Sequence, residues 1–540
     1  MKRLFSLTGI LRGPLALSLC MSMAASAVLA ADAPAEAPRF DVHEYRVLGN
    51  TVLDNRQIEG VLYPLLGDGK TMTDVEAART ALESAYHSLG YATVFVDIPP
   101  QEVNDAIVRL KVTEGHIRAR TISGAKYFSE GRILEALPET TPGTVPRIPQ
   151  LQAELNTLNQ QTADRAVVPV LKAGPEPGTM DLALNVDDHL PLHGSVDFNN
   201  QYTQNTEQLR ATVSLGYTNL FAALDSLTAQ FNTSPQDTSQ VGVLNVMYGF
   251  RPFGPGIRTS LSFTNSSSDV ASVGTLGVLG NGQVYSARAM FPLEMQPGST
   301  QSLSLGVDYK HFHNTINLAD SDGAALAYVM PIAYANLSLA YSGSWQWSNA
   351  AGRVARSLMF NLSANGGPRG ITNETINFDN SRYQGRGNYS YLKADLNFIT
   401  LLPGDLQLSL RVAGQAAQDP LVVYEQDTLT GADGVRGYLE AEVLSDNGIK
   451  ESAQLTSPTL SWHKFALGDV FGFFDSAHAH YLSPLPGQPT YIDLRSAGAG
   501  FDLLPGHAVT GTFTWAYTLL PGIVTGNHES RFLFDVRGTF

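Results

Sequence analysis

Cysteine is almost absent from this chain of 540 residues, and its single cysteine is Cys20. That residue lies in an amino-terminal segment that has basic residues at its start, an apolar stretch over 14–29 and small residues up to Ala30. This pattern predicts a secretory signal peptide over residues 1–30, with a retained membrane anchor as the alternative. Removal of the signal peptide leaves a chain without disulfides or thiolate chemistry.

Charge is also sparse. Only 16% of the residues are charged, whereas about a quarter is usual for soluble domains. Beyond residue 30 the chain has 32 basic and 50 acidic residues, a net charge of −18. Phosphate contacts need clustered Lys and Arg, so a nucleic-acid partner is not expected. No later stretch has the ~18 apolar residues of a membrane helix, although barrel strands give weak hydropathy signals.

Motifs for catalysis are missing too. The sequence has no zincin motif, nucleophile elbow or phosphate loop. The pairs His311/His313 and His478/His480 each place two imidazoles on one strand face, but no third ligand is evident, so solvated histidines are the better interpretation. The glycine-rich stretch 277–282 lacks the strand–loop–helix context of a dinucleotide site. We expect no enzyme activity, no cofactor and no metal.

Two small α/β modules are predicted after a short Ala/Pro linker over residues 31–39. In the first module, residues 40–117, the pattern predicts a helix that begins at Thr73 with Glu76 in a capping box, and strands on both sides of it. The second module, residues 118–189, has weaker signals for a similar sheet with helices on one face. Its Pro/Gly-rich segment 173–178 is predicted to be a hairpin turn.

From residue 190 to 540 apolar and polar residues alternate with a period of two, which is typical of strands with one apolar and one mostly polar face. Short Pro-Gly turns join some segments and long polar loops join others. The last strand carries outward apolar residues up to a terminal aromatic: Phe532, Phe534, Val536 and Phe540. These features predict a transmembrane β-barrel with a wet lumen. Aromatic residues near strand ends, such as Tyr217, Phe221, Tyr248, Phe250 and Phe253, are candidates for interfacial girdles, with ordinary strand aromatics as the alternative.

The first module resembles a polypeptide-transport-associated (POTRA) domain. The matching residues are Gly49, Asn50, Gly90, Tyr91, Pro99, Gln101, Glu114 and Gly115. The pattern is similar to that of the TpsB transporters, the outer-membrane partners of two-partner secretion (type V), often called hemolysin secretion/activation proteins (ShlB/FhaC/HecB type). Residues 118–189 resemble the second POTRA domain of that family, which implies a membrane barrel of about sixteen antiparallel strands after two POTRA domains.

Two barrel motifs extend the resemblance. The segment Val435, Arg436, Gly437, Tyr438 matches the tip of a loop that folds inward in this superfamily, here around 425–445, and Phe473 to Asp475 matches its Phe-x-Asp strand motif. Arg436 has a planar fork of donors that suits the carboxylate of Asp475, so this pair is expected to anchor the loop to the wall. Well-studied members begin with a plug helix, and the nine residues of the linker are too few for one.

The resemblance implies a transporter in the bacterial outer membrane, with its POTRA domains in the periplasm. It implies secretion of a large TpsA-like partner exoprotein of adhesin or hemolysin type. A factor that assembles or inserts outer-membrane proteins is the alternative, and a porin-like channel is a third possibility. Besides the exoprotein and outer-membrane lipid, the expected partner is the barrel-assembly machinery, for which Phe540 and its strand resemble the recognition signal.

Overall fold

The computed structural model describes residues 38–540 apart from 104, 205, 255, 269–270, 273–277, 294–297, 320–324, 350–351, 369, 371–374, 463–464 and 504–507. The predicted signal peptide and most of the linker lie outside this part. The chain forms two compact units. One comprises the residues up to 118 with 142–150 and 173–180, and the other comprises 119–141, 151–172 and 181–540. Among the described residues, no helix combines the length and apolar character needed to cross a bilayer.

The first unit contains a three-stranded sheet in the order β2-β5-β4, with two helices packed against it. The sheet buries alternate residues: Leu110 and Val112 pack in a cluster with Ala78, Leu82 and Tyr86 of the longer helix, and Val108 packs in a second cluster with Val75 of that helix. The elements are β1 (Phe40–Val42), β2 (Glu44–Leu48), α1 (Asn55–Leu62), η1 (Tyr63–Leu65), β3 (Gly67–Lys70), α2 (Met72–Ser88), β4 (Val94–Asp97) and β5 (Ile107–Glu114).

The start of α2 corrects the expectation from the sequence. The N-cap is Thr71 and its capping-box partner is Asp74, not Thr73 and Glu76. Asp74 Oδ2 accepts hydrogen bonds from the Thr71 amide (2.7 Å) and from the Thr71 hydroxyl (2.8 Å). Both pairs have the spacing of a capping box, so the pattern alone could not choose between them.

Glu114, at the end of β5, connects three segments of this unit. Its carboxylate accepts hydrogen bonds from the amides of Thr51 (2.8 Å) and Val52 (3.0 Å) and from the hydroxyls of Thr51 and Tyr86. Gly49 permits the approach of this loop, because its φ is +86° and a Cβ there would lie 2.5 Å from the Val112 carbonyl oxygen. Glu114 is therefore a structural carboxylate at the centre of the first module.

The remaining POTRA-signature positions also make local contacts. Gly90 has φ +95° and its carbonyl accepts the amide of Ile148 (3.0 Å). The Gln101 side chain binds both backbone groups of Arg109 at 2.7 and 2.8 Å. The side-chain amide of Asn50 donates to Leu53 O, and the backbone amide of Gly115 donates to Thr93 O. Tyr91 packs against the hydrophobic core, and Pro99 is half-buried.

The second α/β module has a three-stranded sheet in the order β6-β8-β7. Its elements are β6 (His116–Ser123), α3 (Glu130–Glu135), η2 (Pro138–Thr140), α4 (Ile148–Asn159), β7 (Arg165–Ala173) and β8 (Thr179–Asp188). The predicted hairpin turn over 173–178 lies between β7 and β8. Leu151, Leu155 and Leu158 of α4 are buried at helical spacing.

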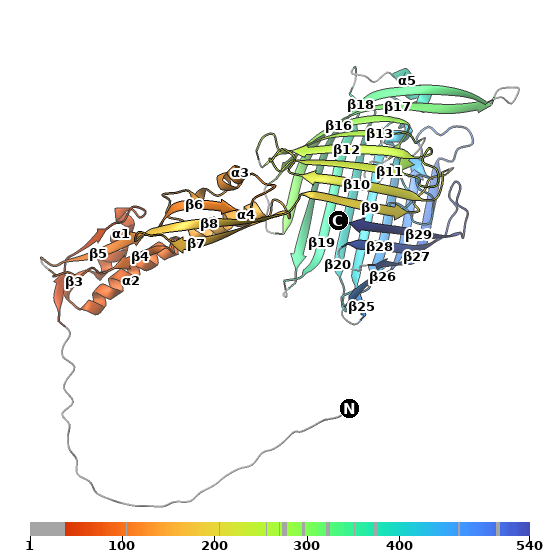
Figure 1. Cartoon of the computed structure of the whole chain (residues 1–540). Helices are drawn as coiled ribbons and strands as arrows, with labels where there is room; N and C mark the ends of the chain where they lie inside the picture. Colours follow the sequence, from red (N-terminus) through yellow and green to blue (C-terminus); the bar gives the residue numbers. More distant parts are fainter. Residues whose placement is uncertain are drawn as a thin grey trace, which may run out of the picture. The chain divides into compact units, whose positions relative to one another are not determined.

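Sixteen long antiparallel strands in the described part of the chain close into a barrel (Figure 1). Consecutive strands pair, and β29 returns to β9. They are β9 (Leu192–Asn199), β10 (Arg210–Thr218), β11 (Ser226–Thr233), β12 (Gly242–Phe250), β13 (Arg258–Ser266), β16 (Gly282–Pro292), β17 (Ser299–Ala319), β18 (Ala325–Ser348), β19 (Val354–Gly366), β20 (Ser390–Leu401), β21 (Gln407–Ala417), β24 (Asn447–Thr456), β26 (Phe465–His480), β27 (Tyr491–Leu503), β28 (Val509–Thr518) and β29 (Ser530–Thr539).

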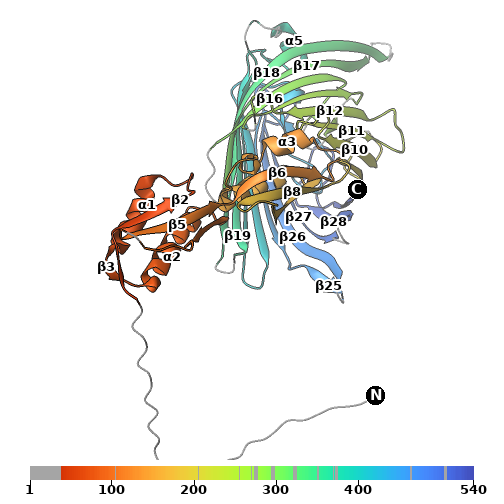
Figure 2. The ribbon, with the colours of Figure 1, turned by 60° about the vertical axis from the view of Figure 1, so that its left-hand side comes forward.

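Small additional elements accompany the barrel. The short strand β25 (Leu460–Trp462) pairs with β26, β14 (Ala271–Ser272) pairs with β15 (Val278–Leu279), and β22 (Asp427–Thr428) pairs with β23 (Leu444–Ser445). The helix α5 (Thr375–Ser381) packs on β18, and Figures 1 and 2 both place it beside the long β17–β18 hairpin.

The two faces of the barrel strands differ as the period of two predicts. Large apolar side chains such as Leu261, Leu396 and Phe532 are exposed on the outer face. Polar side chains such as Asp308, Asp475 and Thr514 are buried on the inner face. A bilayer has no water to satisfy backbone groups, so closure of the ladder and this alternation are what membrane insertion requires.

We predict that Glu114→Ala destabilises the first module by about 2–3 kcal/mol, because the amides of Thr51 and Val52 lose a charged acceptor. Pulse proteolysis of the full chain across a urea series measures this as an earlier cleavage midpoint of residues 40–117. The exposed Glu59→Ala on α1 is the control and should leave the midpoint unchanged. Equal midpoints for both variants would contradict the role of Glu114.

Candidate functional site in the barrel lumen

A long loop, residues 418–446 between β21 and β24, folds back against the inner face of the barrel. Leu429, Val435, Tyr438 and Val443 of the loop are fully buried and cluster with Ala477, Ala479 and Leu494 of β26 and β27. The Val435 amide also donates to Leu429 O (2.8 Å), which closes the tip on itself. The loop is thus a packed element within the lumen.

Arg436, at the tip, forms a two-pronged ion pair with Asp475 on β26. Nε donates to Oδ2 (2.8 Å) and Nη2 donates to Oδ1 (2.9 Å). The Arg436 amide also donates to Oδ2 (3.2 Å), and Ser452 of β24 donates to Oδ1 (2.7 Å). Asp475 is completely buried. A planar guanidinium on a carboxylate, with the remaining lone pairs satisfied, is the geometry in which a buried pair is strongest.

Phe473, two residues before Asp475, supports the same guanidinium. The Arg436 Cζ atom lies 3.5 Å from the centre of the Phe473 ring, as a cation–π contact requires. Arg436 Nη1 also donates to Gln454 Oε1 (2.9 Å) on β24. The structure therefore brings together the residues of both motifs, and adds Ser452 and Gln454, which no sequence motif marks.

Gly437 and Tyr438 complete the tip. Gly437 has φ +101°, and a Cβ there would lie 3.3 Å from the Ala516 Cβ on β28, so the turn needs glycine. The hydroxyl of Tyr438 donates to the carbonyl oxygen of Leu520 (2.6 Å) or of Arg495 (3.0 Å). The tip is thus bound to β26 on one side and to the β28 end of the wall on the other.

Glu425, at the beginning of the loop, makes a second attachment that the sequence did not reveal. This buried carboxylate on η4 (Val423–Glu425) accepts hydrogen bonds from Lys310 Nζ (2.5 Å), Tyr334 Oη (2.7 Å) and Tyr391 Oη (2.7 Å). These donors belong to β17, β18 and β20, on a different arc of the wall from β26. The loop is therefore held to two distinct parts of the cylinder.

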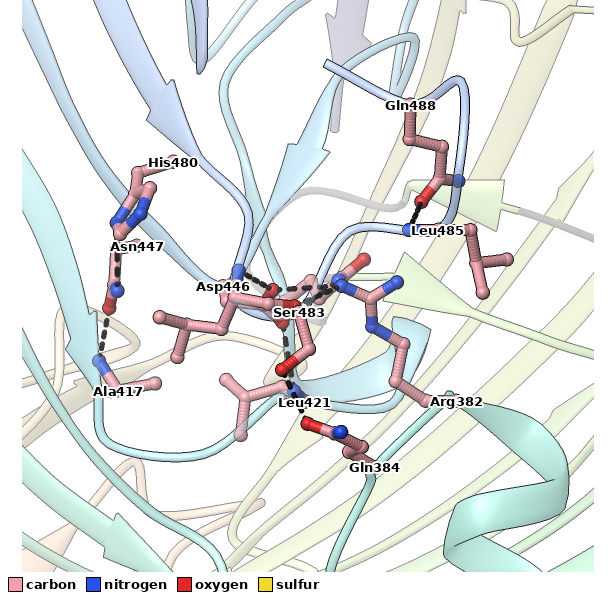
Figure 3. Close-up of polar contacts among 12 residues, drawn as sticks. Arg382, Gln384, Ala417, Leu421, Asp446, Asn447, His480, Ser483, Leu485 and Gln488 are labelled. Atoms are coloured by element: carbon pink, nitrogen blue, oxygen red, sulfur yellow. Dashed lines mark hydrogen bonds and ion pairs between the residues drawn. The ribbon is translucent and has the colours of Figure 1, made fainter. Parts of the chain in front are cut away.

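Asp446, at the end of the loop, makes a third attachment (Figure 3). Its fully buried carboxylate accepts the amides of Leu421 (2.8 Å) and Leu482 (2.9 Å) and pairs with Arg382 Nη2 (3.1 Å). Arg382 follows α5 in the loop before β20, and Leu482 lies in the loop after β26. Figure 3 shows the Arg382 and Asp446 side chains pointing toward one another, so one carboxylate joins three loops at the same end of the barrel.

The open space around the tip is small. Cavities of about 200 and 180 Å³ both have Arg436 in their lining. Each is below the roughly 300 Å³ at which small-ligand pockets begin.

The carboxy terminus seals the seam between the first and last strands. Phe540 and Gly194 of β9 exchange two backbone hydrogen bonds (3.0 and 3.1 Å). A Cβ at Gly194 would meet the Phe540 ring at 2.2 Å, so the aromatic ring lies directly over the glycine. The ring is 71% exposed, and Phe532, Phe534 and Val536 alternate with inward-facing Leu533 and Asp535.

Candidate metal ligands are few in the described residues. Asp41, His43 and Asp68 of the first unit lie close enough to share an ion, but all three are exposed. The rings of His311 and His313 are 4.5 Å apart, and His478 pairs with Asp493 (2.7 Å) on the outer face. None of these groups contacts the luminal loop.

Comparison with known proteins connects this geometry to a family. Residues 40–115 match the POTRA domain of ShlB type, and residues 178–476 match the haemolysin secretion/activation protein family ShlB/FhaC/HecB. The second match covers more than half of the chain. The chain belongs to this family. The predicted relationship to TpsB transporters is therefore confirmed, and with it the place in two-partner secretion and the outer-membrane location.

Individual relatives agree with the assignment. The outer membrane transporter CdiB of Dickeya dadantii (strain 3937) is 22% identical over 451 residues, which cover 82% of this chain and 76% of the relative. The structure of CdiB from Escherichia coli is 17% identical and covers 94% of this chain and 92% of that one, with a TM-score of 0.56.

BamA from Haemophilus ducreyi lacking POTRA domains 1–3 is 13% identical over 93% of this chain and all of that one, with a TM-score of 0.58. At these identities the structural likenesses concern the fold. They agree with the predicted sixteen-strand barrel, which is confirmed.

We predict that Asp446→Ala loosens the three joined loops without opening the barrel. The amides of Leu421 and Leu482 should exchange hydrogen about tenfold faster or more, since each loses a bond to a charged acceptor. Hydrogen exchange with mass spectrometry on the detergent-solubilised protein measures this. Asp405→Ala removes an exposed ion pair with Arg353 and serves as the control. Unchanged exchange at both amides would rule out Asp446 as the joining group.

Proposed function

We propose that this protein secretes one large exoprotein, of TpsA-like adhesin or hemolysin type, from the periplasm to the cell surface, and that Arg436 holds the luminal loop in the resting position. The observation that carries the proposal is the luminal loop itself: it packs against the inner wall and is attached through buried ion pairs to strands on different arcs. Buried ion pairs can separate when both charges become hydrated. A plug held by apolar contacts alone has no charged groups whose hydration would favour its release.

We assign capture of the exported chain to the two periplasmic modules. We assign residues 40–117 and 118–189 to two POTRA domains and residues 190–540 to the barrel. In the described sheets, β2 and β4 form the edges of the first module and β6 and β7 those of the second. An unfolded segment can add to such an edge as a further strand, with backbone hydrogen bonds that do not depend on its sequence.

The chain then threads the lumen after the loop moves. The sequence carries no nucleotide-binding motif, and we assign the protein no catalytic activity, cofactor or nucleic-acid partner. Direction follows from folding of the exoprotein outside the cell. We assign Phe540 and its strand to recognition by the barrel-assembly machinery, because the terminal aromatic is exposed at the seam between the first and last strands.

Arg436→Ala should lower secretion about tenfold or more while the barrel still assembles, because the buried Asp475 loses its partner and the loop its position. The readout is the amount of the exoprotein in the culture medium, with heat-modifiable migration as the test of assembly. Arg288→Ala breaks a wall pair with Asp308 that does not involve the loop and is the matched control. Normal secretion together with unchanged channel conductance would remove the anchor role.

Deletion of residues 40–189 separates secretion from passive conduction. We expect the truncated barrel to insert and to export no exoprotein, since nothing then delivers the chain to the lumen. Planar-bilayer recordings and the secretion assay are made on the same preparations. Retained export would contradict the capture role. An assembly factor, the alternative suggested by the BamA-like fold, would instead show as loss of other outer-membrane proteins with unaffected export.

A further inference from the structure

A cleft of about 380 Å³ lies between the second module and two turns of the barrel. Phe128, α3 and the end of α4 form one wall, and the turns after β10 and after β12 form the other. Direct bonds fix these walls to each other. Asp164 pairs with His193 (2.8 Å) and accepts the hydroxyl of Thr218 (2.7 Å), and Asn219 donates to the Tyr127 carbonyl (2.9 Å).

The cleft is lined by three arginines: Arg132 on α3, Arg165 on β7 and Arg251 directly after β12. None of them forms an ion pair in the described part of the chain, and Glu135 is the acid that shares the lining. Arg165 is only 4% exposed and stacks over Phe128. Its Nη2 donates to Leu158 O (2.8 Å) and to Gln161 Oε1 (3.3 Å), whereas its Nε has no hydrogen-bond partner. A buried guanidinium with an unused donor is expensive unless an anion completes it.

Asp188 is the charged neighbour of Arg165, and its Oδ1 has no hydrogen-bond partner. Burial lowers the pKa of Arg165, with Asp188 opposing the shift, and Asp188 already accepts three backbone amides through its other oxygen. Burial and the neighbouring Arg258 lower the pKa of Arg251. Arg251 thus has a like charge, that of Arg258, as its neighbour.

Aromatic side chains place the cleft at the level of the lipid headgroups. Phe221, in the turn that lines it, is 71% exposed and meets the Tyr248 ring edge-on at 6.1 Å, and Tyr248 stacks on Phe250 at 5.2 Å. Phe253, beside Gly254 of the lining, is exposed as well. Exposed aromatic rings at strand ends mark the membrane–water interface of barrels. The modules precede β9 at this same end, so the interface is that of the periplasmic leaflet.

We propose that this cleft binds the phosphate of an anionic phospholipid of the periplasmic leaflet. Arg132, Arg165 and Arg251 receive the phosphate, and the apolar wall formed by Phe128, Leu158 and Leu224 accepts the glycerol and upper acyl carbons. Guanidinium groups suit phosphate because their donors lie in a planar fork. A bound lipid would fill the gap between the second module and the barrel and hold the module against the membrane.

A free phosphate has the same charge chemistry, but it would leave the apolar wall of the cleft without a contact. A carboxylate of an exported chain would not account for the position of the cleft at the level of the lipid headgroups. The lipid therefore fits the observations better than either of these ligands. The proposal does not depend on secretion, since the binding assay below uses the protein alone.

The test is native mass spectrometry of the full chain in detergent micelles, titrated with phosphatidylglycerol or with phosphatidylcholine. We expect retention of phosphatidylglycerol in preference to phosphatidylcholine. Each of Arg132→Gln and Arg251→Gln should weaken it about fivefold, and the double variant about 25-fold, as expected for single charges near a membrane surface. Both positions avoid the fully buried Arg165, and heat-modifiable migration confirms that each variant is folded.

Arg353→Gln, in the turn between β18 and β19 at the same end of the barrel, is the matched control and should retain the wild-type affinity. Three outcomes would overturn the proposal: equal retention of the two lipids, a double variant that binds phosphatidylglycerol like the wild type, and displacement of the lipid by inorganic phosphate at equal concentration. The last outcome would identify the cleft as a site for small anions.

Discussion

The requirement that no backbone amide or carbonyl face hydrocarbon unpaired governs the barrel. It forces the strands to close, and closure in turn creates an interior that lipid cannot fill. In this protein the interior is filled by a loop of the chain itself. The backbone groups of the wall are already hydrogen-bonded to neighbouring strands, so the loop is held by side chains. The buried carboxylates and the small cavities beside Arg436 follow from this arrangement.

Buried charge fixes the loop at three points. Glu425, Arg436 and Asp446 are spread along it, and each meets an opposite charge on a different strand or loop. The Arg436 pair is completed by Ser452 and Phe473, so little of either ion is left without a partner. A buried ion without a partner is costly, whereas in a complete buried pair the attraction only roughly repays the desolvation, so we infer that such pairs specify one position of the loop more than they add to stability.

Much of the barrel could be predicted from the sequence, because a period of two is clear in strands such as β10, β17, β21 and β28, and because Arg436 and Asp475 lie in short motifs. The helix α1 was missed since its eight residues offer barely two turns of pattern. Glu425 and Asp446 left no signal, because their partners Lys310 and Arg382 are 115 and 64 residues away. Contacts of that kind arise from closure of the barrel, which no local pattern records.

The seam between the two end strands is the shortest ladder of the cylinder. β29 and β9 share five register pairs, whereas β17 and β18 share twenty-one. The two backbone hydrogen bonds between Phe540 and Gly194 extend this ladder by one residue pair. Hydrogen-bond ladders part most easily where they have the fewest rungs, so mechanical or thermal rupture of this barrel would start beside its own carboxy terminus and leave the long hairpin intact until the end.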